Sequence, residues 1–456
     1  METPICDFVR NYADRGMVRM HMPGHKGKPA DGPERMDITE IGGADELYRA
    51  RGIIRRSEEN ASALFGTERT VYATEGSSLC IRAMLYLALL SAGERGIEPV
   101  LLAGRNAHRT LMTAAALLGV EVDWLLPSPV RGSCATPLSC RIDCRELERR
   151  LSRKTCMAVY LTSPDYLGHR ADLEAAAEIC HRHGVPLLVD NAHGAYLKFL
   201  TPDVHPISLG ADLCCDSAHK TLSCLTGAAY LHLSHAAPEP WRDRMEEALS
   251  LFASTSPSYL TLASLDRMNR LLAEDYPARL QRAVQRLEGI KKSLLREGWF
   301  LEGDEPLKLT LKAADRGYTG RELQERLRQE GLEAEFADRE YLVLMPSAET
   351  EESEWRSMEE ALRKIPARPP LRETPPELPR PVRVCSIREA MLAPGEWVPT
   401  EEAVGRVLAD AALSCPPAVP VVMAGERITA DAADCMSWYG ITRCRVMRSQ
   451  GGASAE

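Results

Sequence analysis

The middle of the chain alternates short apolar runs with stretches in which apolar positions recur at helical spacing. The apolar runs predict strands at Val100–Ala103, Val120–Leu126, Met157–Thr162, Pro186–Asp190, Leu213–Ser217 and Ala228–Leu233. Helical patterns cover Leu79–Leu90, Thr110–Leu118 and Asp172–His183. This alternation predicts an α/β fold with a mostly parallel sheet that helices cover on both faces. Ligands of such sheets bind at the carboxyl ends of the strands.

The pattern changes near Leu260, from which a long helical stretch runs to Leu294. A smaller α+β unit is predicted next, in the order strand, helix, strand, helix. Its elements are Leu307–Leu311, Gly320–Glu330, Tyr341–Met345 and Glu351–Lys364. A Pro-rich linker then leads to a short third unit that ends near Met447, and the polar tail after it is expected to be disordered.

The chain of 456 residues is long enough for two to three domains. We expect an N-terminal arm (1–30), a large ligand-binding domain (31–270), a small α+β domain (271–365), the linker (366–381), a C-terminal domain (382–447) and the tail (448–456).

Composition narrows the class of protein. The net charge of -9, without a long stripe of Lys or Arg, argues against a nucleic-acid partner. The N-terminus lacks the apolar core of a signal peptide, and the longest apolar stretch, Ala83–Ala92, is too short to span a membrane. The 14 cysteines are therefore expected to be reduced thiols in the cytoplasm. Cys134, Cys140 and Cys144 cluster, but their spacing matches no zinc pattern, so we expect no metal site.

The strongest chemical signal is a lysine, Lys220, in the segment from Asp216 to Thr221, which follows an apolar strand. The residues around Lys220 are apolar and small, which is unusual for a mere surface charge. A desolvated lysine has a lowered pKa and can form a Schiff base. Ser217 and His219, next to it, are placed to reach the phosphate of the same ligand.

A second signal is Asp190, which ends the strand Pro186–Asp190 and precedes Ala192, His193 and Gly194. An unpaired carboxylate is costly to bury at such a position, and a pyridinium N–H would be a suitable partner. Taken alone, the aspartate could equally be a helix N-cap. Its place thirty positions before Lys220 favours the pyridinium partner.

Two weaker signals lie upstream. Gly76, Ser77 and Ser78 precede a helix, whose N-terminus offers backbone N–H groups, hydroxyls and the positive dipole end to an anion. His108 follows the strand Val100–Ala103, where its ring can lie flat on a pyridine, although a lone histidine is more often structural.

In this order, the motifs resemble the Orn/Lys/Arg decarboxylase family, whose members are pyridoxal phosphate (PLP) enzymes of the aspartate-aminotransferase fold, fold type I. The resemblance extends from His21–Gly27 through Ile41–Leu47 and Ser254–Tyr259 to Ala263–Asp266, Ser386–Ala390 and Cys415–Pro420. The overall length resembles the compact members, which lack a receiver-like N-terminal domain.

The resemblance implies a role for each matching residue. Lys220 would carry PLP, Asp190 would bind its ring nitrogen, and His108 and Ala192 would lie against the two ring faces, with His193 beside them. Gly76, Ser77, Ser78, Ser217 and His219 would hold the phosphate. A hydroxyl of Ser254, Thr255 or Ser256 would reach the phosphate of a partner subunit, which implies a homodimer, or a higher homo-oligomer, with shared active sites.

Several positions depart from the family pattern. Glu75 stands where Asn is usual, Asn191 where Glu is usual, Ala107 and Arg109 flank His108 in place of Cys and Lys, Asp216 and Ala218 flank Ser217 in place of Gln and Thr, Ile387 replaces Pro, and Cys415 replaces Tyr. None of these changes removes a group that the chemistry requires, so they put the substrate in doubt more than the reaction.

The implied reaction is decarboxylation of arginine, lysine or ornithine, with arginine favoured because the compact members resemble arginine decarboxylases, and the implied setting is polyamine biosynthesis. A carboxylate must then meet the distal cation of the substrate. The candidates are Glu40, Asp45, Glu46, Glu396 and Glu426. Two alternatives stay open: another PLP reaction, such as transamination or a lyase reaction, and a non-catalytic relative that binds PLP for regulation.

Overall fold

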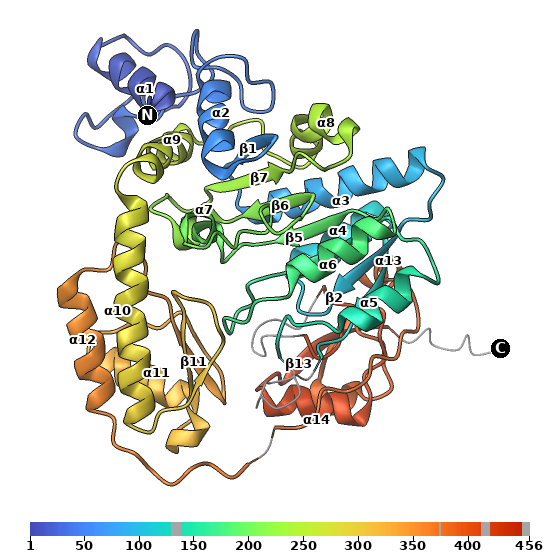
Figure 1. The fold of residues 1–456 in the computed structure, drawn as a ribbon. Coiled ribbons are helices and arrows are strands. Elements are labelled where there is room, and N and C mark those ends of the chain that lie inside the picture. The colour runs from blue at the N-terminus through green and yellow to red at the C-terminus, as the bar shows by residue number, and fades with distance from the viewer. Residues whose placement is uncertain (129–137, 374, 412–419, 449–456) are drawn as a thin grey trace.

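A central sheet of seven strands organises the protein in the computed structural model, which describes residues 1–128, 138–373, 375–411 and 420–448 (Figure 1). The strand order is β1-β7-β6-β5-β4-β2-β3. The strands β2 to β6 pair in parallel, and β7 is antiparallel to both of its neighbours. The bounds are β1 (Arg69–Ala73), β2 (Val100–Gly104), β3 (Glu121–Leu125), β4 (Ala158–Thr162), β5 (Leu187–Asp190), β6 (Leu213–Asp216) and β7 (Ala229–Leu233). The mostly parallel sheet predicted from the apolar runs is confirmed.

Alternate residues of the central strands enter two different cores. In β5, Leu188 packs with residues of α3 (Ser77–Glu94) and α4 (Arg109–Leu118), while Leu187 and Val189 pack with residues of α5 (Cys144–Leu151) and α6 (Leu173–Arg182). Both faces are thus covered, which explains why the strands are continuous apolar runs. Asp190 lies two residues after Leu188 and so faces the side of α3 and α4.

The N-terminal region and the helices that follow the large sheet pack against each other. The carboxylate of Asp266, on α9 (Tyr259–Ala273), accepts hydrogen bonds from the backbone N–H groups of Ile5 and Cys6 in α1 (Pro4–Asp14). Before α10, the chain also contains the helices α2 (Ile53–Phe65), α7 (Ala218–Thr221) and α8 (Glu239–Ser250). It has 3-10 turns at Pro33–Arg35 and Ala195–Phe199.

The long helical stretch predicted near Leu260 is two helices, α9 and α10 (Tyr276–Arg296). A proline in the first turn of α10 explains the break, because proline is tolerated there but not inside a helix. A second sheet of four strands follows, in the order β10-β11-β9-β8. Its elements are β8 (Leu301–Glu302), β9 (Leu309–Lys312), a 3-10 turn (Ala314–Arg316), α11 (Gly320–Gln329), β10 (Phe336–Ala337), β11 (Tyr341–Leu344) and α12 (Glu352–Arg363).

A small C-terminal domain contains α13 (Ile387–Leu392), β12 (Gly395–Pro399), a 3-10 turn (Thr400–Ala403), α14 (Ala430–Trp438) and β13 (Arg443–Met447), and its two strands pair antiparallel. A buried ion pair joins it to the large sheet: the two terminal guanidinium nitrogens of Arg105, just after β2, donate to the two carboxylate oxygens of Glu426 at 2.8 and 2.7 Å. The expectations for Cys134, Cys415 and the tail from 449 onward lie outside the described residues.

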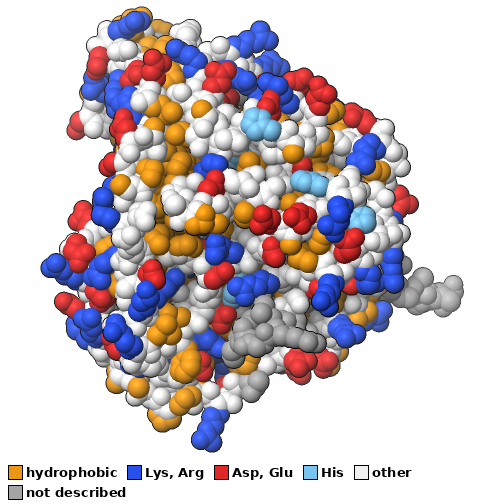
Figure 2. All heavy atoms as spheres, in the orientation of Figure 1, with side chains coloured by type: hydrophobic (Ala, Val, Ile, Leu, Met, Phe, Trp, Pro, Cys, Tyr) orange, Lys and Arg blue, Asp and Glu red, His pale blue; other side chains and the backbone are white. Residues whose placement is uncertain are grey.

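The surface mixes charges of both signs. On the face drawn in Figure 2, blue basic and red acidic side chains are interspersed with apolar ones. Among the described residues, no helix has both the length and the apolar character that crossing a membrane requires.

Candidate active site

A cavity of about 560 Å³ lies at the carboxyl ends of the central strands. Loops that follow β1, β2, β4, β5 and β6 contribute its walls, as expected for a parallel sheet. The predicted site residues that line it are Gly76, Ser77, Ser78, His108, Asp190, Ala192, His193, Ser217, His219 and Lys220. Ser254 and Thr255, predicted to act on a partner subunit, are exposed and do not line the cavity of their own chain.

Lys220 lies in α7, a single turn that directly follows β6, and its amine points toward a histidine. Its Nζ is 3.1 Å from Nε2 of His193. On the other side of the same ring, Nδ1 lies 3.4 Å from Nζ of Lys308. Burial, together with these two lysines, lowers the pKa of His193 well below its usual value, so its imidazole is neutral.

Asp190 is a buried carboxylate, 1% exposed, at the end of β5. The hydroxyl of Tyr160 donates to one oxygen at 3.1 Å, and the N–H of Ala192 donates to the other at 3.1 Å. Within the described part of the chain, no basic side chain forms an ion pair with it. A buried carboxylate without a counter-ion is costly, so a cationic N–H donor in the cavity would be a favourable partner.

An anion-binding end is formed where α3 begins. Gly76 caps this helix with a φ of +73°, a backbone conformation that favours glycine. Ser77, the first residue of α3, and Ser217, which follows β6, lie side by side with their hydroxyl oxygens 2.8 Å apart. Helix N–H groups, the helix dipole and two hydroxyls together suit a phosphate.

Two histidines beside this end have defined tautomers. Nδ1 of His108 accepts a hydrogen bond from the backbone N–H of Thr110 at 3.3 Å, so its ring hydrogen is on Nε2. Burial lowers the pKa of His108, although Asp190 opposes the shift. His219 instead directs Nδ1 at the carbonyl of Ala228, 2.9 Å away, and must donate there. His219 could therefore donate to a phosphate only with a second ring proton.

A buried cluster supports the floor of the site from behind. Asp216, at the end of β6, accepts hydrogen bonds from Nε2 of His205 at 3.0 Å and from Nε2 of His232 at 3.2 Å. Burial alone would raise the pKa of Asp216, but the two histidines hold it well below its usual range. The carboxylate is therefore charged and satisfied by hydrogen bonds from its neighbours.

The sequence did not indicate Tyr160, Asp165 or Lys308 as site residues. Asp165 lines the cavity, and its carboxylate accepts from the backbone and the ring of His169. Burial would lower the pKa of His169, but Asp165 and Glu302 raise it to about 9. The sequence did offer one sign of Lys308, because a lysine within the apolar run that leads into β9 is unusual.

None of the carboxylates proposed for the distal cation lines the cavity in this chain: Glu40, Asp45, Glu46, Glu396 and Glu426. Four of them have structural partners, and one of these is Glu46, which forms an exposed ion pair of 3.7 Å with Arg49. Glu426 is paired with Arg105, and Glu396 with Arg406. Asp45 accepts several backbone N–H groups at the start of α2, including that of Gly52 at 2.7 Å.

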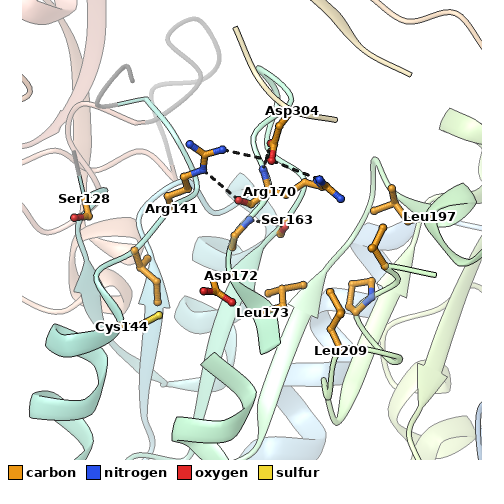
Figure 3. Close-up of a pocket in the computed structure, with 14 residues that line it drawn as sticks. Ser128, Arg141, Cys144, Ser163, Arg170, Asp172, Leu173, Leu197, Leu209 and Asp304 are labelled. Carbon is orange, nitrogen blue, oxygen red and sulfur yellow. Dashed lines mark hydrogen bonds and ion pairs between the residues drawn. The ribbon is translucent and has the colours of Figure 1, made fainter. Parts of the chain in front are cut away.

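A second cavity, of about 430 Å³, lies behind the loop that follows β4. In Figure 3, Arg141 and Arg170 both point toward the carboxylate of Asp304, with which they form ion pairs of 3.4 and 3.6 Å. It contains none of the predicted site residues. The cavity that holds Lys220 is therefore the candidate active site.

Comparisons with known proteins agree with this geometry. The family model described as "Orn/Lys/Arg decarboxylase, major domain" matches residues 3–314, and that of the "Orn/Lys/Arg decarboxylase, C-terminal domain" matches residues 385–444. An uncharacterized Bacillus subtilis protein, YaaO, is 31% identical and covers 96% of this chain and 94% of its own length. The arginine decarboxylase of Bacillus anthracis is 27% identical, over 94% of this chain and 91% of its own length.

Solved structures share the fold. The constitutive lysine decarboxylase of Escherichia coli superposes with a TM-score of 0.75 at 18% identity, covering 98% of this chain and 82% of its own. The lysine decarboxylase LdcF of Francisella novicida gives a TM-score of 0.77 at 16% identity, covering 98% and 81%. At such identities the likeness shows the fold alone.

Proposed function

The chain belongs to the Orn/Lys/Arg decarboxylase family, and on that premise we propose that its substrate is arginine. The resemblance, the fold type and the PLP-dependent decarboxylation of a basic amino acid predicted from the motifs are confirmed. Membership also argues against transamination and against a purely regulatory role. The choice of arginine is supported by relatives named arginine decarboxylase, which are 27–28% identical over 93–94% of this chain.

One observation carries the assignment of the site: an amine, a buried carboxylate that no described basic side chain pairs with, and an anion-binding helix N-terminus meet in one cavity. Lys220, Asp190 and the start of α3 all line it. An amine for a carbonyl, a carboxylate for a protonated ring nitrogen and donors for a phosphate are the groups that PLP requires. The donor set of this chain therefore fits the cofactor.

When bound, PLP supplies the electron sink that accepts the pair left by carbon dioxide. The chain supplies the rest. Asp190 would accept a hydrogen bond from the ring nitrogen and keep a proton there, because no basic side chain among the described residues forms an ion pair with its carboxylate. Tyr160 and the N–H of Ala192 fix the orientation of that carboxylate.

His108 and Lys220 are the candidates to deliver a proton to the carbon that loses carbon dioxide. The Nε2 hydrogen of His108 can be donated, because Nδ1 is occupied as an acceptor. Lys220 is next to His193, a neutral ring that can exchange a proton with it. Both side chains are exposed where they line the cavity, so the desolvated lysine expected from the apolar residues around Lys220 is not found.

We further propose that two chains share their active sites, in the cytoplasm, and that the amine product enters polyamine biosynthesis. Support for the shared site comes from the loop at Ser254. Its hydroxyl-bearing residues are exposed, and the N–H of Ser254 donates to Glu75, a cavity residue, at 2.7 Å. The loop therefore lies at the edge of the cavity, where the hydroxyl of Ser254 accepts a hydrogen bond from the N–H of Ser256 at 3.1 Å.

The substrate proposal is tested by steady-state kinetics on the PLP-loaded protein with arginine, lysine and ornithine. We expect kcat/KM for arginine to exceed the other two by at least ~10-fold, which corresponds to about 1.4 kcal/mol of selective binding. A preference for lysine or ornithine would replace arginine without changing the reaction class. Equal values for all three would contradict a site selective for the shape of the distal cation.

A further inference from the structure

A lysine that the reaction scheme does not use is buried behind the active site. Lys308 is 3% exposed and immediately precedes β9, the third strand in the order of the small sheet. Its amine donates to the backbone carbonyl of Asp165 at 3.0 Å and lies 5.8 Å from the centre of the Tyr166 ring. Among the described residues, no carboxylate forms an ion pair with it. A charge buried at such a site without an ion pair costs free energy.

The third neighbour of Lys308 is His193, which connects it to Lys220. The ring of His193 has one lysine amine at each nitrogen: Lys308 at Nδ1, 3.4 Å away, and Lys220 at Nε2, 3.1 Å away. The ring of Tyr166, 5.1 Å from that of His193, packs against its side. The two lysines are 88 positions apart in the chain, Lys220 after a strand of the large sheet and Lys308 before a strand of the small one, so the fold brings them together around one imidazole.

Lys308, His193 and Lys220 form a row of three side chains, and the protons they share can be arranged in two ways. With the ammonium on Lys308, that group donates to Nδ1, the ring hydrogen is on Nε2, and Lys220 is a neutral amine that accepts it. If Lys308 passes one proton to Nδ1 while Nε2 passes its own to Lys220, the ammonium is on Lys220 and Lys308 is neutral. The ring is neutral in both, and the total charge is unchanged. Burial of the ring, which disfavours imidazolium, favours such a paired transfer.

We propose that Lys308 is a positioning residue that sets the tautomer of His193 and, through that ring, stores the proton that Lys220 takes up and releases. The proposal rests on the proposed function for the identity of Lys220 as the reacting amine. Lys220 must be neutral to bond to a carbonyl and charged to deliver a proton, and a reservoir one ring away permits both states.

Other titratable groups around this row set the background of any pH experiment. His108 and His219 face His193 from the loop after β2 and from α7. Glu305, Asp165 and Glu335 surround Lys308 from the two sheets. Variants that change Lys308 and leave all of these groups in place isolate the contribution of Lys308 to the pH dependence.

The test measures acetylation of Lys220 against pH in the full chain with its cofactor removed, quantified by mass spectrometry relative to the exposed Lys154. This readout does not depend on decarboxylation. The proposal about Lys308 can therefore fail while the proposed function stands, and the proposed function can fail while the proposal about Lys308 stands. In Lys308→Met, no second amine is left to hold the shared proton, so that proton stays on Lys220. We expect acetylation at pH 7 to fall about 10-fold, as for a profile displaced by one pH unit.

Two further variants distinguish three effects of the substitution: loss of the donor at Nδ1 of His193, loss of proton storage, and general damage to the fold. Lys308→Arg keeps a donor at Nδ1 but cannot give up its proton, so we expect acetylation within about 2-fold of wild type and, in the loaded enzyme, kcat lowered at least ~10-fold with KM unchanged. Lys291→Met removes a half-buried lysine, whose amine donates to the carbonyl of Glu305 at 3.1 Å, and should leave both readouts unchanged.

The proposal is overturned if the acetylation profile of Lys308→Met matches wild type, or if Lys291→Met displaces it equally. Should Lys308→Met fail to fold, Lys308→Arg decides: wild-type kcat in that variant rules out proton storage.

Discussion

The side-chain amide of Asn191 donates a hydrogen bond of 2.7 Å to the carboxylate of Asp216. Both residues depart from the pattern of the family that the sequence resembles, Asn191 in place of Glu and Asp216 in place of Gln. They follow or end neighbouring strands, β5 and β6, directly behind Asp190. The two departures therefore compensate each other: the donor and the acceptor have exchanged positions.

This pairing predicts a strong coupling between the two positions. Asn191→Glu alone should lower the free energy of unfolding by ~2–4 kcal/mol, because it buries a second carboxylate against Asp216. In the double variant with Asp216→Gln, the new amide can donate to the new carboxylate, so at least ~1 kcal/mol should be regained. Urea unfolding of the four proteins of this cycle measures the coupling. Additive losses would mean that the two side chains act independently.

A second prediction concerns Glu58, on α2, which is buried and whose pKa is raised to about 8 by that burial. Its folded-state pKa lies above the unfolded value, so the folded chain binds the extra proton between about pH 4.5 and 8, and stability falls as pH rises through that window. Glu58→Gln keeps an acceptor for the N–H of Tyr72 and removes the titration.

Glu58→Gln should therefore unfold like wild type near pH 5 and be more stable at pH 8.5, by ~1–3 kcal/mol. Thermal and urea unfolding at both pH values measure this difference. Glu59→Gln is the matched control, since Glu59 is an exposed residue on the same helix. A variant that is less stable than wild type at pH 8.5 would contradict a burial penalty on the charged form.

A third prediction tests the ion pair between Arg105 and Glu426, whose side chains are 3% and 5% exposed. Glu426→Ala leaves a buried guanidinium without its partner and should cost ~3–5 kcal/mol of the free energy of unfolding. Glu396→Ala breaks the more exposed pair with Arg406 and should cost less than ~1 kcal/mol. Similar losses in the two variants would mean that the buried pair does not attach the C-terminal domain to the large sheet.

A fourth prediction addresses the phosphate end of the cavity. Ser77→Ala and Ser217→Ala should each raise the dissociation constant of PLP ~10-fold or more, since each removes a hydroxyl able to donate to a charged phosphate. Titration of the protein without its cofactor, followed by absorbance, gives these constants. Ser152→Ala changes an exposed serine far along the chain and should have no effect. Unaltered binding in both test variants would place the phosphate elsewhere.

Much of the fold followed from local pattern. The central strands are buried on both faces and are therefore continuous apolar runs, which the sequence displays directly. Asp190 and Lys220 stand at or just after the ends of two such runs, so the general position of the site was also predictable. Strands of two residues, β8 and β10, are too short to leave a pattern, and neither was predicted.

What the sequence could not supply are contacts between distant side chains. Lys308 and His193 are 115 positions apart, and only the placement of the small sheet beside the large one brings them into contact. The pairing of Asn191 with Asp216 depends on the register of β5 against β6. The carboxylates proposed for the distal cation were chosen by type and segment alone, and neither property reveals that Glu426 is already paired with Arg105.

The central claim is that Lys220 is the reacting amine of a decarboxylase for basic amino acids. The most direct measurement is release of labelled carbon dioxide from carboxyl-labelled arginine, lysine and ornithine by the PLP-loaded protein, beside Lys220→Ala and the surface control Lys154→Ala. We predict release from at least one substrate, unchanged in the control and reduced at least ~1,000-fold in Lys220→Ala. Release that persists in Lys220→Ala, or none from any of the three substrates in the wild type, would contradict the claim.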